Sequence, residues 1–243
     1  MYQQMTELKN RIKNINGGKV LDIATGQGVF LKTLLQNINS YEVAFGCDIS
    51  KEDLEIAKNN LEDENVHLIL GKEDALFFLD GEFDLVTISN GLHHFKNVDS
   101  IISEAIRVLK PNGLLLINEM LSNDLSEPQL THKKFHDFSM RVGKLFGESG
   151  NSTAYTDKEV KRLFEIDRNS LKLIEQCIHE EDKTNFINEE EIERVSKVID
   201  ERVHSISTLS EYDKLKRDGE QIKARLREFG IHRSKHIFLL YKK

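Results

Sequence analysis

The sequence predicts an α/β fold in which a mostly parallel sheet is covered by helices on both faces. Short apolar runs alternate with helical patterns as far as Met120, and this alternation is typical of sheets built from βαβ units. The first run ends in a glycine-bearing turn, and Pro111 and Gly113 separate the last run of the series from the helix before it. The 243 residues are enough to bury one substantial core.

The elements follow one another regularly along the first half of the chain. Residues 5–15 are a polar helix candidate, and further helices are expected to begin near Val29, Lys51 and Val98. The strands are the apolar runs that begin at Val20, Tyr41, Val66, Phe83 and Leu114. Ligands of such sheets bind beyond the carboxyl ends of the strands. We therefore expect a site in the turns that follow these runs.

The alternation ends after Met120. Residues 121–155 contain a loop, a helix candidate at 129–146 and a flexible tract with two glycines. A strand candidate follows at 171–179. This part of the chain is expected to add a helical segment to the sheet.

A strongly charged segment precedes the last strand. Residues 185–230 carry apolar residues at helical spacing, which predicts an amphipathic helix or a helix pair. Residues 236–241 form the last strand, so the charged segment is an insertion within the C-terminal hairpin. The predicted helix pair of residues 185–230 packs on its own domain or serves as an arm for a homodimer, and the pattern favours the first interpretation.

The most specific signal is the turn after the first strand. Asp22 belongs to the apolar run, and Gly26 and Gly28 follow it. Glycine adopts positive φ and lets backbone approach a nucleotide closely. The dinucleotide fingerprint needs a third glycine where Leu31 stands, and the Asp22 carboxylate would repel a pyrophosphate but attract an ammonium group. The turn therefore favours an adenosine that carries an amino acid over NAD.

This turn resembles the first motif of the class I S-adenosylmethionine-dependent methyltransferases, acid-x-Gly-x-Gly-x-Gly. The chain has Asp22, Ala24, Gly26 and Gly28 at these positions, and Ala24 is a small residue that departs from the pattern. The resemblance implies a Rossmann-like sheet of seven strands with an antiparallel last strand. It also implies that the turn lies against the methionine part of S-adenosyl-L-methionine, and that residues 121–155 form a lid over the substrate.

Further residues are expected to hold this cofactor. Asp48 ends the second strand, and a carboxylate there can accept both hydroxyl hydrogens of a ribose. In the family the matching acid binds the ribose and the next residue, here Ile49, packs on the adenine. The alternative is that Asp48 caps the helix beginning near Lys51 and that Asp22 only stabilises its turn. The resemblance also implies an adenine contact at Asp74 and Ala75, after the third strand.

The loop after the fourth strand carries the candidate base. By resemblance, its residues Asn90, His93 and His94 contact the cofactor or the substrate. An acceptor with a high pKa profits from a positioned base, for which His94 is the candidate; alternatively, both histidines only shape the loop. His132 and His136 lie four residues apart on one face of the helix at 129–146 and are expected to face the substrate. They lack the H-E-x-x-H arrangement, so no metal is expected, and solvated helix histidines are the alternative.

Composition limits the partners and the location. The 34 basic and 41 acidic residues give a net charge of −7, which argues against nucleic-acid binding. Cys47 and Cys177 form no disulfide framework, and no signal peptide or membrane-length apolar run is present. The expected location is the cytoplasm, with no membrane partner.

These observations predict a single methyltransferase domain. Its core is 17–120 and 156–243, with the lid-like segment 121–155 and the helical insertion 185–230. The expected reaction is in-line transfer of a methyl group from S-adenosyl-L-methionine to oxygen, nitrogen or activated carbon of a small molecule, leaving S-adenosyl-L-homocysteine. The alternatives are a cofactor-binding module without catalysis and an NAD(P)-dependent oxidoreductase.

Overall fold

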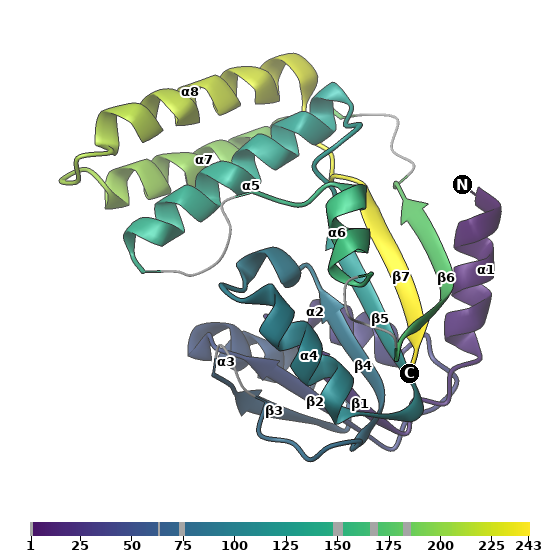
Figure 1. Cartoon of the computed structure of the whole chain (residues 1–243). Coiled ribbons are helices and arrows are strands. Elements are labelled where there is room, and N and C mark those ends of the chain that lie inside the picture. The colour runs from purple at the N-terminus through teal and green to yellow at the C-terminus, as the bar shows by residue number, and fades with distance from the viewer. Residues whose placement is uncertain (1, 63, 73–75, 148–152, 166–169, 182–185) are drawn as a thin grey trace. The chain divides into compact units, whose positions relative to one another are not determined.

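The computed structural model divides the chain into two compact units (Figure 1). It describes residues 2–62, 64–72, 76–147, 153–165, 170–181 and 186–243. The sheet unit comprises residues 1–119, 158–179 and 236–243. The helical unit comprises residues 120–157 and 180–235.

A seven-stranded sheet forms the centre of the sheet unit. Its strand order is β3-β2-β1-β4-β5-β7-β6. The strands are β1 (Lys19–Ile23), β2 (Val43–Asp48), β3 (Val66–Leu70), β4 (Phe83–Ser89), β5 (Leu109–Met120), β6 (Lys172–His179) and β7 (His236–Lys242). Strands β1 to β5 pair in parallel, whereas β6 and β7 pair antiparallel. The predicted fold class is confirmed.

The strand order reverses direction next to β1. From β1 the chain proceeds outward through β2 to β3, and it then returns to β4 on the other side of β1. In open α/β sheets, ligands bind at such a switch point, outside the carboxyl ends of the strands. The turns after β1, β2 and β4 meet at this edge.

Helices cover both faces of the sheet. One core contains side chains of α1 (Tyr2–Lys13), α2 (Val29–Leu35) and α3 (Lys51–Asn60), packed on Val20 of β1 and Leu85 of β4. The buried residues of α4 (Val98–Val108) lie outside this cluster, and Figure 1 shows α4 in front of the sheet and α2 behind it. The helices expected near Val29, Lys51 and Val98 begin at those residues, because each follows a strand and its turn.

The sequence-based boundary of β5 is wrong. Pro111 to Gly113 were expected to precede the strand, yet β5 begins at Leu109 and includes them. Leu109 pairs with Phe83 and Leu114 pairs with Leu85, so the register shifts between these pairs. The turn residues are accommodated in this irregularity, where Asn112 adopts a φ of 66°.

Three long helices form the core of the helical unit. They are α5 (Glu127–Leu145), α7 (Glu189–Ser205) and α8 (Tyr212–Phe229). Their buried apolar residues form one cluster that includes Phe138 of α5, Ile199 of α7 and Leu226 of α8. The sequence predicts residues 121–155 and 185–230 as separate additions to the sheet, but the described parts of both belong to this one unit. No described helix combines the length and apolar character that a membrane crossing requires.

The start of α3 offers a direct test of the local fold. Ser50 is the N-cap, and its hydroxyl accepts a hydrogen bond from the Asp53 N–H at 3.1 Å. We expect Ser50→Ala to lower the free energy of unfolding by about 1 kcal/mol, because the helix loses this partner. Urea unfolding measures the change. Ser103→Ala, on the exposed side of α4, is the control, and an equal loss in both variants would contradict the capping role.

Candidate cofactor site

The turn after β1 has a left-handed backbone at three alternate residues. The φ angles are 56° at Ala24, 51° at Gly26 and 75° at Gly28. Gly28 is also the N-cap of α2. Left-handed backbone disfavours residues with a Cβ atom, which explains physically why the motif favours glycine at these positions. Ala24 keeps the same conformation with one methyl group added.

Asp22 lies buried beside this turn. Asp22 is 1% exposed, and its Oδ1 accepts a hydrogen bond from the Thr87 hydroxyl at 2.5 Å. Its Oδ2 has no hydrogen-bond partner among the residues that the structure describes. Burial raises the pKa of the carboxyl from 3.8 to about 6, against the lowering effects of the Thr87 and Thr25 hydroxyls. A buried acceptor without a partner is suited to a cation or a donor from a ligand.

Asp48 ties the turn after β1 to the end of β2. Its Oδ2 accepts the Gly26 N–H at 2.7 Å, and its Oδ1 accepts the Ser50 N–H at 2.9 Å. The alternative that Asp48 caps α3 is wrong, because Ser50 is the cap. Each carboxylate oxygen keeps a second lone pair, so two ribose hydroxyls could still donate to it. The next residue, Ile49, exposes 53% of its surface.

The turn after β4 comes to the same edge of the sheet. Asn90 has a φ of 50°, and its N–H donates to the Asn118 carbonyl of β5 at 2.7 Å. The Asn118 side chain donates to the Ser89 hydroxyl at 2.9 Å. These bonds fix the start of the loop that carries the two histidines.

A buried pair follows in this loop, and one member was missed by the sequence analysis. His93 Nδ1 lies 2.5 Å from Glu119 Oε1, and the Leu92 N–H donates to Glu119 Oε2 at 3.1 Å. His93 is 1% exposed and Glu119 is fully buried. His94 is exposed, with its ring centroid 4.2 Å from that of His93. The available signal for Glu119 was an acid at the end of an otherwise apolar strand.

His132 and His136 lie on α5, in the helical unit. Both side chains are partly buried. Burial lowers the pKa of His132 to about 4, with smaller contributions from the charges of His136 and Arg233. His132 Nδ1 lies 3.5 Å from the Ser234 hydroxyl. His136 Nδ1 lies 3.6 Å from Asp137 Oδ1.

Asp74 and Ala75 lie outside the described residues. The segment that follows them is held by α4. Arg107 donates to the carbonyls of Leu76 and Phe78 at 3.1 and 2.9 Å, and to Asp80 at 2.7 Å. The predicted adenine contact of Asp74 and Ala75 stays a prediction.

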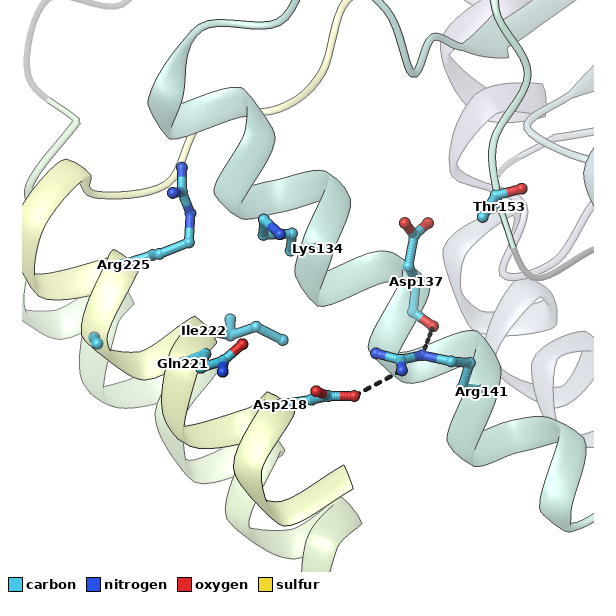
Figure 2. A pocket seen from close by; sticks show the side chains of 9 residues that line it. Lys134, Asp137, Arg141, Thr153, Asp218, Gln221, Ile222 and Arg225 are labelled. Carbon is cyan, nitrogen blue, oxygen red and sulfur yellow. Dashed lines mark hydrogen bonds and ion pairs between the residues drawn. The ribbon is translucent and has the colours of Figure 1, made fainter. Parts of the chain in front are cut away.

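The helical unit contains a separate pocket of about 630 Å³ between α5 and α8 (Figure 2). Arg141 donates to Asp218 across it at 2.7 Å, and Asp137 accepts from Lys133 at 2.5 Å. Arg225 pairs with Glu127. Asp137 Oδ1 and Arg225 Nε, however, have no hydrogen-bond partner among the described residues. None of the predicted site residues that the structure describes lines this pocket.

Comparisons with known proteins identify the family of the chain. Residues 21–117 match a family model described as a methyltransferase domain. A demethylmenaquinone methyltransferase of Staphylococcus saprophyticus is 31% identical over 176 residues, which are 67% of this chain and 76% of that protein. A ubiquinone/menaquinone biosynthesis C-methyltransferase of Hydrogenovibrio crunogenus is 30% identical over 152 residues, 60% of this chain. The match covers only 59% of that second relative.

A solved structure shares the fold. It is an S-adenosylmethionine-dependent methyltransferase from Thiobacillus denitrificans in complex with S-adenosyl-L-homocysteine, with a TM-score of 0.55 and 16% identity, covering 100% of this chain and 90% of that chain. Together with the sheet order and the β1 turn, these matches show that the chain belongs to the class I S-adenosylmethionine-dependent methyltransferases.

The two glycines of the turn should respond differently to substitution. A Cβ on Gly28 would lie 2.6 Å from Leu61 Cδ1, whereas a Cβ on Gly26 would meet no heavy atom within 4 Å. We expect Gly28→Ala to lower the free energy of unfolding by about 2–4 kcal/mol, from left-handed strain and overpacking together. Gly26→Ala should lose only about 1–2 kcal/mol, from strain alone. Urea unfolding of both variants tests this, and equal losses would contradict the packing difference.

The raised pKa of Asp22 predicts a pH-dependent stability. A carboxyl with a higher pKa in the folded state stabilises fully below pH 4, and this contribution is lost as the pH rises through about 6. The free energy of unfolding of the parent, minus that of Asp22→Asn, should therefore fall by roughly 2.5 kcal/mol between pH 4 and pH 7.5. Denaturant titrations at several pH values measure it. Parallel curves for the two proteins would show that the carboxyl is not desolvated.

Proposed function

We propose that this chain transfers the methyl group of S-adenosyl-L-methionine to a small-molecule acceptor. The observation that carries the proposal is the buried Asp22 carboxylate beside a left-handed turn at the switch point of the sheet. One of its oxygens has no hydrogen-bond partner in the part of the chain that the structure describes. A negative charge in a desolvated place favours a cationic ligand. The cofactor of the family carries both an ammonium and a sulfonium group.

Different residues are proposed to bind the methionine, ribose and adenine parts of the cofactor. Asp22 and the backbone of residues 24–28 hold the methionine part, which their open turn can approach. Asp48 accepts the ribose hydroxyls on its remaining lone pairs, and the exposed face of Ile49 packs on the adenine. Asn90 is proposed to contact the cofactor from the β4 turn.

The reaction needs alignment more than acid–base chemistry. When bound, the cofactor supplies a methyl group that is already activated for in-line displacement. The residues of this chain orient it and the acceptor, and orientation of this kind can supply roughly 7–11 kcal/mol. The turns after β1 and β4 are suited to that task, because Asp48 fixes Gly26 in the first and Asn118 fixes Asn90 in the second.

The packing of α2 argues against the NAD(P)-dependent alternative. Leu31 stands where the fingerprint requires its third glycine, and its side chain is fully buried in the core of the sheet unit. In the fingerprint that glycine permits close packing of the helix on the strand, whereas here a full leucine side chain fills the space. A cofactor-binding module without catalysis remains the second candidate, and only a turnover assay distinguishes it.

The relatives suggest which acceptor to test first. Their names describe methylation in menaquinone and ubiquinone synthesis, so the proposed acceptor is an activated ring carbon of a reduced quinone. Oxygen and nitrogen acceptors stay as alternatives within the same proposal.

The helix pair of the insertion is proposed to pack within its own chain. Val195 and Ile199 of α7 and Ile222 and Leu226 of α8 are buried in the single chain, against α5. Their apolar stripes are thus already covered, which supports this interpretation over a homodimer arm. Cys47 and Cys177 are free and buried, which suits the expected reducing cytoplasm.

Calorimetric titration tests the cofactor assignment. We expect the parent to bind S-adenosyl-L-methionine and S-adenosyl-L-homocysteine and to give no heat with NAD. Asp48→Ala should weaken binding of both by roughly 10- to 100-fold, because hydrogen bonds to a charged group are lost.

Glu52→Ala is the matched control, since it removes an exposed carboxyl from the start of the same helix. It should bind within about twofold of the parent, as expected for a surface charge. Unchanged affinity in Asp48→Ala would refute the ribose assignment, and heat with NAD alone would refute the cofactor.

A further inference from the structure

The pair formed by His93 and Glu119 joins two neighbouring strands at the proposed cofactor edge. Glu119 lies near the end of β5, and His93 lies in the short 3₁₀ helix (Leu92–His94) that follows β4. Strands β4 and β5 pair in parallel up to Ser89 and Asn118, so both residues come just after the last paired position. The pair is thus a fixed part of the carboxyl edge of the sheet.

The hydrogen bonds define which imidazole nitrogen carries the proton. A carboxylate only accepts hydrogen bonds, and Glu119 Oε2 already accepts the Leu92 N–H. With Oε1 at 2.5 Å from His93 Nδ1, the Nδ1 atom is the donor. The other ring nitrogen, Nε2, then carries the lone pair of the neutral ring, because the hydrogen bond made by one ring nitrogen determines which of the two is protonated.

We propose that Glu119 positions His93 as the general base of the methyl transfer, with Nε2 accepting a proton from the acceptor. This inference rests on the proposed function and names the residue that activates the substrate. Glu119 is fully buried. When His93 takes up a proton, its positive ring pairs with the Glu119 carboxylate, which would otherwise be an isolated buried anion. The carboxylate therefore stabilises the protonated ring that the step produces.

The acceptor class follows from this chemistry. A hydroxylated ring loses its O–H proton to His93 Nε2, and the electron pair of that bond moves into the ring. The ring carbon then forms a bond to the methyl carbon while the carbon–sulfur bond breaks, its electrons going to sulfur. The methylated carbon then loses its C–H proton to water, and the electron pair of that bond restores the aromatic ring as a phenolate. The phenolate oxygen takes back the proton held on His93 Nε2. A hydroxyl acceptor would lose its proton to the same nitrogen and be methylated on oxygen.

This assignment gives the role first considered for His94 to its neighbour. The His94 side chain is exposed, and its backbone N–H donates to the Gly91 carbonyl at 3.0 Å. The buried acid Glu119 orients His93, and a fixed ring is what base catalysis requires.

The test compares His93→Gln and Glu119→Gln with the parent. The glutamine at position 93 keeps an N–H donor toward Glu119 but has no basic nitrogen. The assay is steady-state methylation of reduced short-chain demethylmenaquinone, together with calorimetric affinity for S-adenosyl-L-methionine and the melting temperature. We expect His93→Gln to lower kcat by about 10²- to 10⁴-fold. Glu119→Gln should lower kcat by a smaller factor, and Glu119→Asp should recover part of that loss. KM and cofactor affinity should stay within about threefold.

A control and a second measurement separate a base from a structural role. His204→Ala, on the exposed surface of α7, should match the parent in kcat. Nitrogen-15 NMR of labelled histidines, assigned with His93→Gln, should show the Nδ1–H tautomer for His93 in the parent at pH 8.

Distinct results would overturn the inference. A kcat within threefold of the parent in His93→Gln, or a Nε2–H tautomer, would refute it. A loss that resides in cofactor affinity would assign the pair a structural role. A parent that binds S-adenosyl-L-methionine but does not methylate the hydroxylated ring refutes the base and its acceptor class, whereas a parent that does not bind the cofactor refutes the proposed function itself.

Discussion

A carboxylate kept out of water at the end of β1 gives the cofactor edge its chemical character. The Asp22 side chain satisfies one oxygen through Thr87 of the neighbouring strand β4 and leaves the other without a partner among the described residues. Burial of a charge costs free energy unless it is paired. The fold maintains this arrangement because β1 is central and fully covered, and a cationic ligand would relieve the cost.

Long-range hydrogen bonds fix the conformation of the backbone turns around this carboxylate. Asp48 at the end of β2 accepts the Gly26 N–H, and the carbonyl of Asn118 on β5 accepts the Asn90 N–H. The three positive φ angles of the β1 turn thus persist in a rigid frame. Pre-organised backbone of this kind is what an alignment-driven reaction requires.

The sequence predicted what local patterns encode. The β1 turn and the starts of α2, α3 and α4 were predictable, because glycine spacing and apolar periodicity are local properties. The partner of His93 was not, since Glu119 is 26 residues away and only the pairing of β4 with β5 brings the two together. The lowered pKa of His132 and the common core of α5, α7 and α8 likewise depend on packing between distant segments. Asp74 and Ala75 stay predictions.

Proton release on cofactor binding tests the central claim most directly. The pKa of Asp22 is raised to about 6 by burial, so most molecules carry a proton there at pH 5.5, and a bound cation should expel it. Titrating S-adenosyl-L-methionine at pH 5.5 in two buffers with different ionisation enthalpies counts the protons. We expect release of most of one proton in the parent and none in Asp22→Asn. Tight binding to the parent without proton release would contradict the account.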